Sequence, residues 1–78
     1  LGPVFSVAVA PDGETFASAS GLDGTARVWE TEGGKEVRVL RLPKAARGPN
    51  RVAFAPDGKR LAIAAFDNSV RIYDLTAE

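Results

Sequence analysis

Cysteine, histidine and methionine are absent from this 78-residue chain, and tryptophan and tyrosine occur once each. Without histidine or cysteine, the chain lacks the usual zinc ligands and the nucleophile of thiol chemistry. A catalytic triad is also excluded, because Ser18 and Ser20 have no histidine anywhere in the chain to activate them. The absence of cysteine is compatible with any compartment and leans toward a reducing one such as the cytoplasm. The composition therefore excludes these three kinds of catalytic chemistry for this chain.

The chain also lacks a charge of one dominant sign and any long apolar run. Ten basic and ten acidic residues give a formal net charge of zero, which argues against nucleic acid or a membrane surface as the main partner. No apolar run approaches the roughly 20 residues of a membrane span. No signal peptide is visible, but the chain begins at Leu1 rather than Met and is compatible with a segment of a longer protein. A chain of this size forms at most one small, marginally stable domain.

The chain contains one sequence pattern that occurs twice. VAVAPDGETFASA at residues 7–19 returns as VAFAPDGKRLAIA at residues 52–64, 45 positions later. DGTARVWE at residues 23–30 returns as DNSVRIYD at residues 67–74, 44 positions later. A repeat of this period, built from short strands and turns, is typical of propeller blades. One such repeat cannot bury its own faces, so the blades must pack on one another.

Alternating apolar residues and turn signals predict seven strands. Pro11-Asp12-Gly13 ends the first strand, and Gly13 can adopt the positive φ that a short hairpin requires. The alternation slips near Leu40, which indicates a β-bulge or the end of that strand. Residues 43–50, PKAARGPN, predict a loop with two prolines. The expected strands are residues 4–10, 15–20, 25–30, 36–42, 51–55, 60–65 and 69–74.

The predicted fold class is all-β, with two antiparallel propeller blades of four plus three strands that form part of a larger closed ring. Residues 1–43 form the first blade and residues 44–78 the second, which lacks its fourth strand. Val28 and Trp29, like Ile72 and Tyr73, are neighbours on one strand and point to opposite faces. Both faces of each blade are therefore apolar and need to be covered.

The two copies, SVAVAPDG followed by FASAS and DGTARVWE, resemble the WD40 repeat over nearly the whole chain. The resemblance implies a closed ring, usually of about seven four-stranded blades, that acts as a scaffold for proteins or peptides without catalysing a reaction. The second copy, ending in DNSVRIYDL, is also similar to blades of TolB-like and lactonase-like propellers. That alternative implies an enzymatic or transport-associated role. The repeat positions that carry the resemblance are Asp12, Gly13, Asp23, Gly24, Trp29, Asp57, Gly58, Asp67 and Tyr73.

The chain departs from the WD40 pattern at one polar position. The family has a Gly-His pair before the first strand, and its histidine bonds to the turn aspartate. No histidine exists here, and residues 45–46 or 48–49 stand near that place. We therefore expect Asp23 and Asp67 to bond to backbone amides of their own turns.

The turn aspartates and a pair of strand arginines each have both a structural and a functional interpretation. The turn carboxylates Asp12, Asp23, Asp57 and Asp67 resemble calcium ligands, but no second acidic residue stands at the required spacing, so we expect no metal and no cofactor. A paired-carboxylate hydrolase is not expected either, because equivalent repeat positions would have to carry the chemistry twice. Arg27 and Arg71 could form a basic ring, or could simply cover apolar surface with their stems.

The most individual stretch of the chain is the loop that carries Lys44, Arg47 and Arg51, because it breaks the repeat. It could contact an acidic partner, or it could be a solvated connector. We expect a protein or peptide partner, no nucleic acid and no membrane. The ring is expected to close either within a longer chain or through three or four copies of this one.

Overall fold

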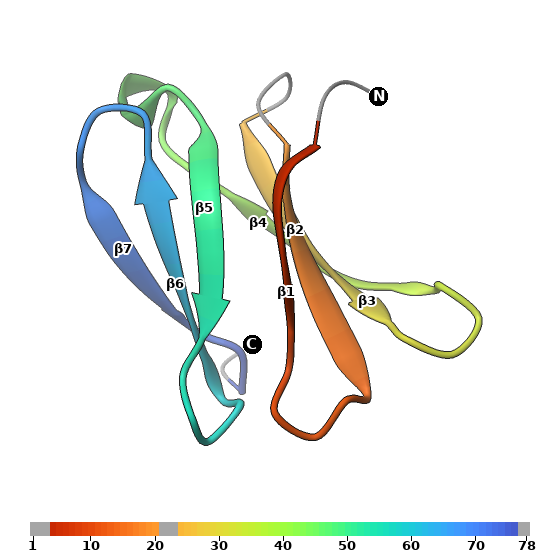
Figure 1. The fold of residues 1–78 in the computed structure, drawn as a ribbon. Coiled ribbons are helices and arrows are strands. Elements are labelled where there is room, and N and C mark those ends of the chain that lie inside the picture. The colour runs from red at the N-terminus through yellow and green to blue at the C-terminus, as the bar shows by residue number, and fades with distance from the viewer. Residues whose placement is uncertain (1–3, 21–23, 77–78) are drawn as a thin grey trace.

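The computed structural model describes residues 4–20 and 24–76 and consists of two antiparallel sheets (Figure 1). The first sheet has the order β1 (Val4–Val9), β2 (Thr15–Ser20), β3 (Thr25–Glu30) and β4 (Glu36–Arg41). A short 3₁₀ turn, η1 (Lys44–Ala46), leads to the second sheet. Its order is β5 (Pro49–Phe54), β6 (Arg60–Ala65) and β7 (Val70–Asp74). The predicted all-β class, with sheets of four and three strands, is confirmed.

Strand boundaries differ from the sequence expectation by one or two residues. The largest difference is at β5, which begins at Pro49 rather than Arg51. Pro49 is paired with Ala65, and the register then slips before Arg51 pairs with Ala64. The same slip occurs at the equivalent place in β1, between Val4 and Ser6. A proline fits at the first position of a strand next to a bulge, because its missing N–H is not needed there.

The irregularity expected near Leu40 lies elsewhere on β4. Val28 pairs with Arg38 and Trp29 pairs with Glu36, so Val37 is the extra residue of a bulge. Leu40 itself is regularly paired with Ala26 and is buried. The change in alternation at Leu40 arises because the bulge has already shifted the phase of the strand.

The two Pro-Asp-Gly turns have the same hydrogen bonds. Oδ1 of Asp12 accepts from the N–H of Glu14, and Oδ1 of Asp57 accepts from the N–H of Lys59, both at 2.9 Å. The next residue in each turn, Gly13 or Gly58, has a positive φ of 73° or 71°, as the sequence predicted. The side-chain bond explains the aspartate, and the positive φ explains the glycine that follows it.

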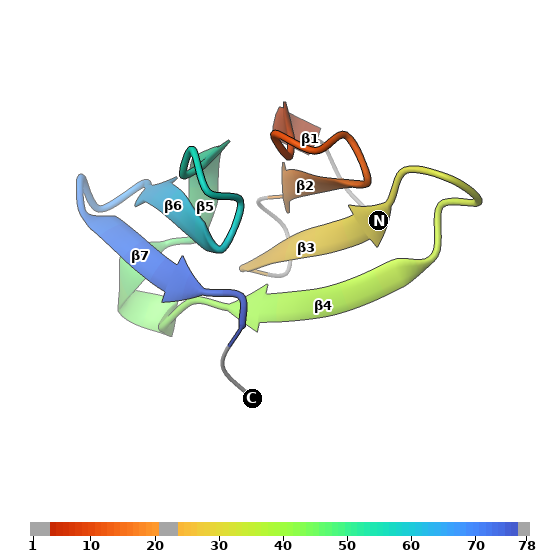
Figure 2. The same cartoon turned by 90° about the horizontal axis from the view of Figure 1, so that it is seen from below.

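The core lies between the two sheets. Figure 2 shows β1 and β5 close to each other, while β4 and β7 are the outermost strands of their sheets. The first sheet contributes mainly small residues to this core, and the second contributes larger ones. The buried residues are Ala17, Ala19, Ala26, Val28, Leu40, Leu42, Ala46, Val52, Leu61, Ile63 and Ala65.

Replacing Gly13 with alanine is expected to destabilise the chain by about 1 kcal/mol, because a Cβ is disfavoured at this positive φ. A Cβ would meet no other atom within 4 Å, so no steric clash adds to the backbone strain. Gly13→Asn is the matched control and should cost less, since asparagine tolerates this region. Thermal unfolding of both variants measures the difference. Equal melting temperatures for Gly13→Ala and the parent chain would contradict the structural role.

Candidate protein interface

The first sheet has an apolar face that nothing covers among the described residues. Val7 and Val9 on β1 are 58% and 63% exposed, while the intervening Ala8 packs toward the core. On the neighbouring strands, Phe16 and Trp29 lie on this same face, because the register pairs Val9 with Phe16 and Phe16 with Trp29. We call this set, Val7, Val9, Phe16 and Trp29, the large face of the first sheet.

The repeat pattern predicts that Trp29 and Tyr73 are packing residues that are largely buried, but Trp29 is only half-buried in the structure. Its ring stacks on Phe16 with a centroid separation of 6.4 Å, and its Nε1 donates to Oγ of Ser18 at 3.0 Å. These contacts all come from its own sheet, so the side of the indole away from the sheet stays open. Tyr73, at the equivalent position of β7, is also only half-buried, but it packs against the core between the sheets.

The second sheet has an uncovered face of a different kind. Val70 and Ile72 on β7 are 68% and 61% exposed. Beside Ile72, a shallow hollow of about 250 Å³ lies over the alanines of β5 and β6 and is bordered by Arg60. We call the residues Ala53, Ala62, Ala64, Val70 and Ile72 the small face of the second sheet.

The repeat relates these two open faces to the two faces that already pack together. Val52, Phe54, Leu61 and Tyr73 of the second sheet belong to the core or pack against it, and they are the repeat equivalents of the large face of the first sheet. On the other side of the core lie Ala8, Ala17, Ala19, Ala26 and Val28. They are the repeat equivalents of the small face of the second sheet.

The turn aspartates act as hydrogen-bond acceptors in their own turns. Oδ1 of Asp67 accepts from the backbone N–H of Ser69 at 3.0 Å and from the Ser69 hydroxyl. These two bonds, the hydroxyl bond first, hold the pKa of Asp67 below its usual value. The Lys59 N–H similarly lowers the pKa of Asp57. The expected bond to a backbone amide is confirmed for Asp67, while Asp23 lies outside the described residues.

Acid should therefore weaken the fold through these turns. A carboxyl with a lowered pKa in the folded state adds stability above its unfolded pKa of about 4, and that stability is lost as the pH falls through the folded value. Asp67→Asn should shrink the drop in melting temperature between pH 7 and pH 3, and Ser69→Ala should shrink it too by removing a donor. Glu32→Gln is the control for loss of one carboxylate elsewhere. An unchanged acid response in Asp67→Asn would contradict this assignment.

The basic loop residues are placed at two different parts of the fold. Lys44 lies in η1, and Arg47 follows it in the left-handed region with a φ of 67°. Arg51 lies on β5, where it pairs with Ala64. All three side chains are exposed. The structure thus brings Lys44 and Arg47 into one connection and leaves Arg51 on the sheet.

The backbone of this connection is firmly anchored. The carbonyl oxygens of Ala46 and Gly48 accept from the N–H groups of Asp67 and Phe66, both at 3.1 Å. The Ala46 side chain is fully buried in the core. Figure 1 shows the connection at the same end of the molecule as the β6–β7 turn, opposite the two Pro-Asp-Gly turns. The charged side chains are therefore carried by a fixed loop.

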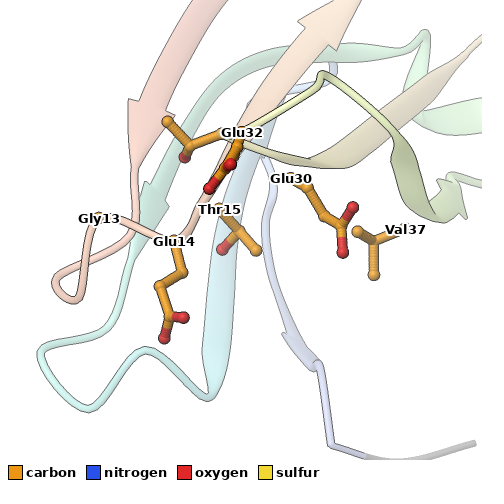
Figure 3. A pocket seen from close by; sticks show the side chains of 7 residues that line it. Gly13, Glu14, Thr15, Glu30, Glu32 and Val37 are labelled. Atoms are coloured by element: carbon orange, nitrogen blue, oxygen red, sulfur yellow. The ribbon is translucent and has the colours of Figure 1, made fainter.

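Sequence reasoning missed an acidic hollow at the Pro-Asp-Gly end. It has a volume of about 870 Å³ and is lined by residues 13–15, residues 30–32 and Val37. Figure 3 shows Glu14, Glu30 and Glu32 around it, with Val37 beside Glu30. The pairing of Thr15 with Glu30 and the bond from Thr31 N–H to the Glu14 carbonyl at 2.9 Å bring the two turns together. That register is the signal from which the hollow could have been found.

The acidic residues do not form an evident metal centre. Across residues 4–20 and 24–76, no group of three or more histidine, cysteine, aspartate or glutamate side chains is arranged to hold a metal ion. Within the same residues, no helix has the length and apolar character needed to cross a membrane. The candidate binding features on the described residues are the two apolar sheet faces, the basic loop and the acidic hollow.

Comparison with known proteins gives the class of this molecule. The family model described as WD domain, G-beta repeat matches residues 1–30 and 34–74. The chain therefore belongs to the WD40 repeat family, whose members in general serve as scaffolds for protein interactions.

Curated relatives are found in fungi, bacteria and animals. Protein hir1 of Emericella nidulans is 36% identical over 95% of this chain, and a WD repeat-containing protein, sll1491, of Synechocystis is 43% identical over 73%. Translation initiation factor 3 subunit I of Aspergillus fumigatus is 40% identical over 77%. The alignments cover only 8% of hir1 and 16% of each of the other two. The chain thus spans a small part of the length of these relatives.

Proposed function

We propose that this chain is a non-catalytic protein-interaction scaffold made of two propeller blades, residues 1–43 and 44–78, whose ring is completed by further blades of the same kind. The observation that carries the proposal is the match between open and packed faces. The large face of the first sheet is equivalent to the surface that the second sheet packs into the core. A further blade can therefore cover each open face by repeating the contact between the two sheets.

Copies of the chain itself can supply these blades. Three or four copies would give six or eight blades, and a longer polypeptide that contains the chain could supply them as well. In this contact the small face of one sheet packs on the large face of the next. Such a head-to-tail contact can be repeated around a ring. The lactonase-like or TolB-like alternative would instead require catalytic groups contributed by sequence outside this chain.

Light scattering of the purified chain at micromolar concentration is expected to give three or four times the monomer mass. Trp29 should then emit as a buried indole, because the large face is covered, and its emission should shift to the red on dilution. Val9→Glu, on the large face, should reduce the mass without unfolding the sheet, since Val9 is 63% exposed in the single chain. Glu32→Lys, in the β3–β4 turn, is the control and should leave the mass unchanged. A folded monomer with exposed Trp29 emission would overturn association through these faces.

We propose further that Lys44, Arg47 and Arg51 contact an acidic protein or peptide. Support comes from their exposure and from the anchored backbone of the connection, which holds Lys44 and Arg47 without needing their side chains. Loops positioned by a rigid scaffold commonly carry binding function. Positive charge at such a loop attracts an acidic partner and makes the association sensitive to salt.

A triple variant, Lys44→Ser, Arg47→Asn and Arg51→Ser, tests this contact. Asparagine is chosen at position 47 because it tolerates the left-handed φ. The variant should unfold at nearly the parent temperature, since exposed charges contribute little to stability. It should bind a poly-glutamate peptide at low salt at least about tenfold more weakly than the parent chain. Equal binding and an equal salt dependence would show that the loop is only a connector.

A further inference from the structure

Phe5 and Phe66 form an aromatic pair that joins the two sheets outside their common core. The ring centroids are 5.4 Å apart and the rings are inclined at 78°, which is an edge-to-face arrangement. The two residues are 46% and 44% exposed, and neither belongs to the buried core. Among the described residues, no other aromatic side chain is as exposed as these two. A contiguous aromatic surface that the protein leaves in water is a candidate anchor for a partner.

Both phenylalanines stand at positions where the two repeats differ. Phe5 is the extra residue of the bulge in β1, and the matching bulge of β5 has Asn50 in its place. Where the second copy has Phe66, the first copy has the two residues 21–22, Gly-Leu. The bulge thus forms with a polar residue as well as with phenylalanine. The repeated fold therefore does not require an aromatic ring at either position.

The aromatic pair spans a junction that lies within this chain. Phe5 is followed by Ser6, whose Oγ accepts from the N–H of Val52 in the second sheet at 3.3 Å. A further sheet would stack on the large face of the first sheet or on the small face of the second. Both of these faces point away from the junction between the two sheets. The aromatic pair therefore keeps its surroundings however the ring is completed.

Two exposed cations lie at the same end of the molecule as the start of β1 (Figure 1). The carbonyl oxygens on either side of Arg47 accept from the N–H groups of Phe66 and Asp67, both at 3.1 Å, which places Arg47 next to the aromatic pair. Lys44 lies in η1, three residues before Arg47. Neither cation has an ion pair with another described residue. The carboxylate of Asp67 is already bonded to Ser69, so the two cations are available to an acidic partner.

Arg51 lies on the other side of the second sheet. The next residue, Val52, is buried in the core between the sheets. Successive side chains of a strand point to opposite faces, so Arg51 points away from the junction. Of the three basic residues in the proposed function, Lys44 and Arg47 therefore share a surface with the aromatic pair, and Arg51 does not.

We propose that Phe5, Phe66, Lys44 and Arg47 bind an acidic peptide segment that carries a large apolar residue. The apolar side chain packs against the two rings, and the carboxylates of the peptide lie beside the two cations. This inference rests on the proposed contact of the basic loop with an acidic partner, and it adds the apolar residue that selects among acidic segments. A peptide fits this surface better than a nucleic acid, because the inclined rings offer no parallel faces on which successive bases could stack.

Two labelled peptides of equal charge, EEEFEEE and EEESEEE, test the proposal by fluorescence anisotropy with the full chain. The phenylalanine peptide should bind at least about fivefold more tightly than the serine peptide. Phe5→Asn, which introduces the residue of the matching bulge, should abolish this preference, and so should Phe66→Ala. Both variants should bind the serine peptide as the parent chain does, and their thermal unfolding checks that they are folded.

Two control variants should keep the preference for the phenylalanine peptide. Val37→Ala removes an apolar side chain that is 55% exposed at the Pro-Asp-Gly end. Arg51→Ser removes the cation that lies away from the aromatic pair. Lys44→Ser combined with Arg47→Asn should instead weaken the binding of both peptides, and raised salt should do the same in the parent chain.

The outcomes separate this inference from the proposed function on which it rests. Equal affinity of the parent chain for the two peptides, or a preference that survives both Phe5→Asn and Phe66→Ala, would overturn the inference and leave the charge contact standing. Unchanged binding of the serine peptide by the Lys44 and Arg47 double variant would instead contradict the proposed function. An oligothymidylate that binds more tightly than the phenylalanine peptide, and loses this affinity in Phe5→Asn, would replace the peptide site with a nucleic-acid site.

Discussion

The contact between a face of small residues and a face of large ones is the interaction on which the rest of this structure depends. Ala17, Ala19 and Ala26 of the first sheet are fully buried, and Leu61 and Ile63 of the second sheet are fully buried opposite them. Alanine lets the sheets approach closely, and the larger aliphatic side chains fill the space between them. Without the partner sheet, each face would be exposed to water and would lose its dispersion contacts.

This contact has a direction, because a small face receives a large one. A sheet that is small on one side and large on the other can stack only head-to-tail, which leaves one face of each kind open at the two ends. The half-buried state of Trp29 is a consequence of this geometry. Its own sheet supplies Phe16 and Ser18, and only a neighbouring sheet could cover the rest of the ring.

Much of the fold could be predicted because its signals are local. The Pro-Asp-Gly turns are closed by bonds between residues two to five positions apart, so a short sequence window contains the whole cause. Strand alternation is local in the same sense. The start of β5 was missed because Pro49 joins the strand only through Ala65, 16 positions away, and a proline by itself favours a loop. The bulge at Val37 depends on how Trp29 pairs with Glu36, which alternation on one strand does not reveal.

The candidate site was less predictable, since it depends on what neighbouring elements supply. The acidic hollow forms only because the β2–β3 register sets Glu14 near Glu30, and the sequence of either turn alone does not indicate it. Arg27 and Arg71 show the same limit in another way. They are equivalent by sequence, yet one bonds to a strand that follows it and the other turns to Asp67 in its own hairpin. Equivalent positions of a sequence repeat have the same backbone geometry, but the partners of their side chains depend on which strands and turns lie next to them.

Polar groups at the junction of the two sheets set the strength of any repeated contact. Oγ of Ser6 accepts from the N–H of Val52 at 3.3 Å, and Arg38 donates to the Leu75 carbonyl at 2.7 Å. The repeat equivalent of Ser6 is Arg51, which has no hydroxyl to accept such a bond. If a further sheet covered the small face of the second sheet by repeating this contact, the apolar contact of the faces would be kept and the bond made by Ser6 would be lost. That repeated contact should consequently be weaker than the one between the two sheets of this chain.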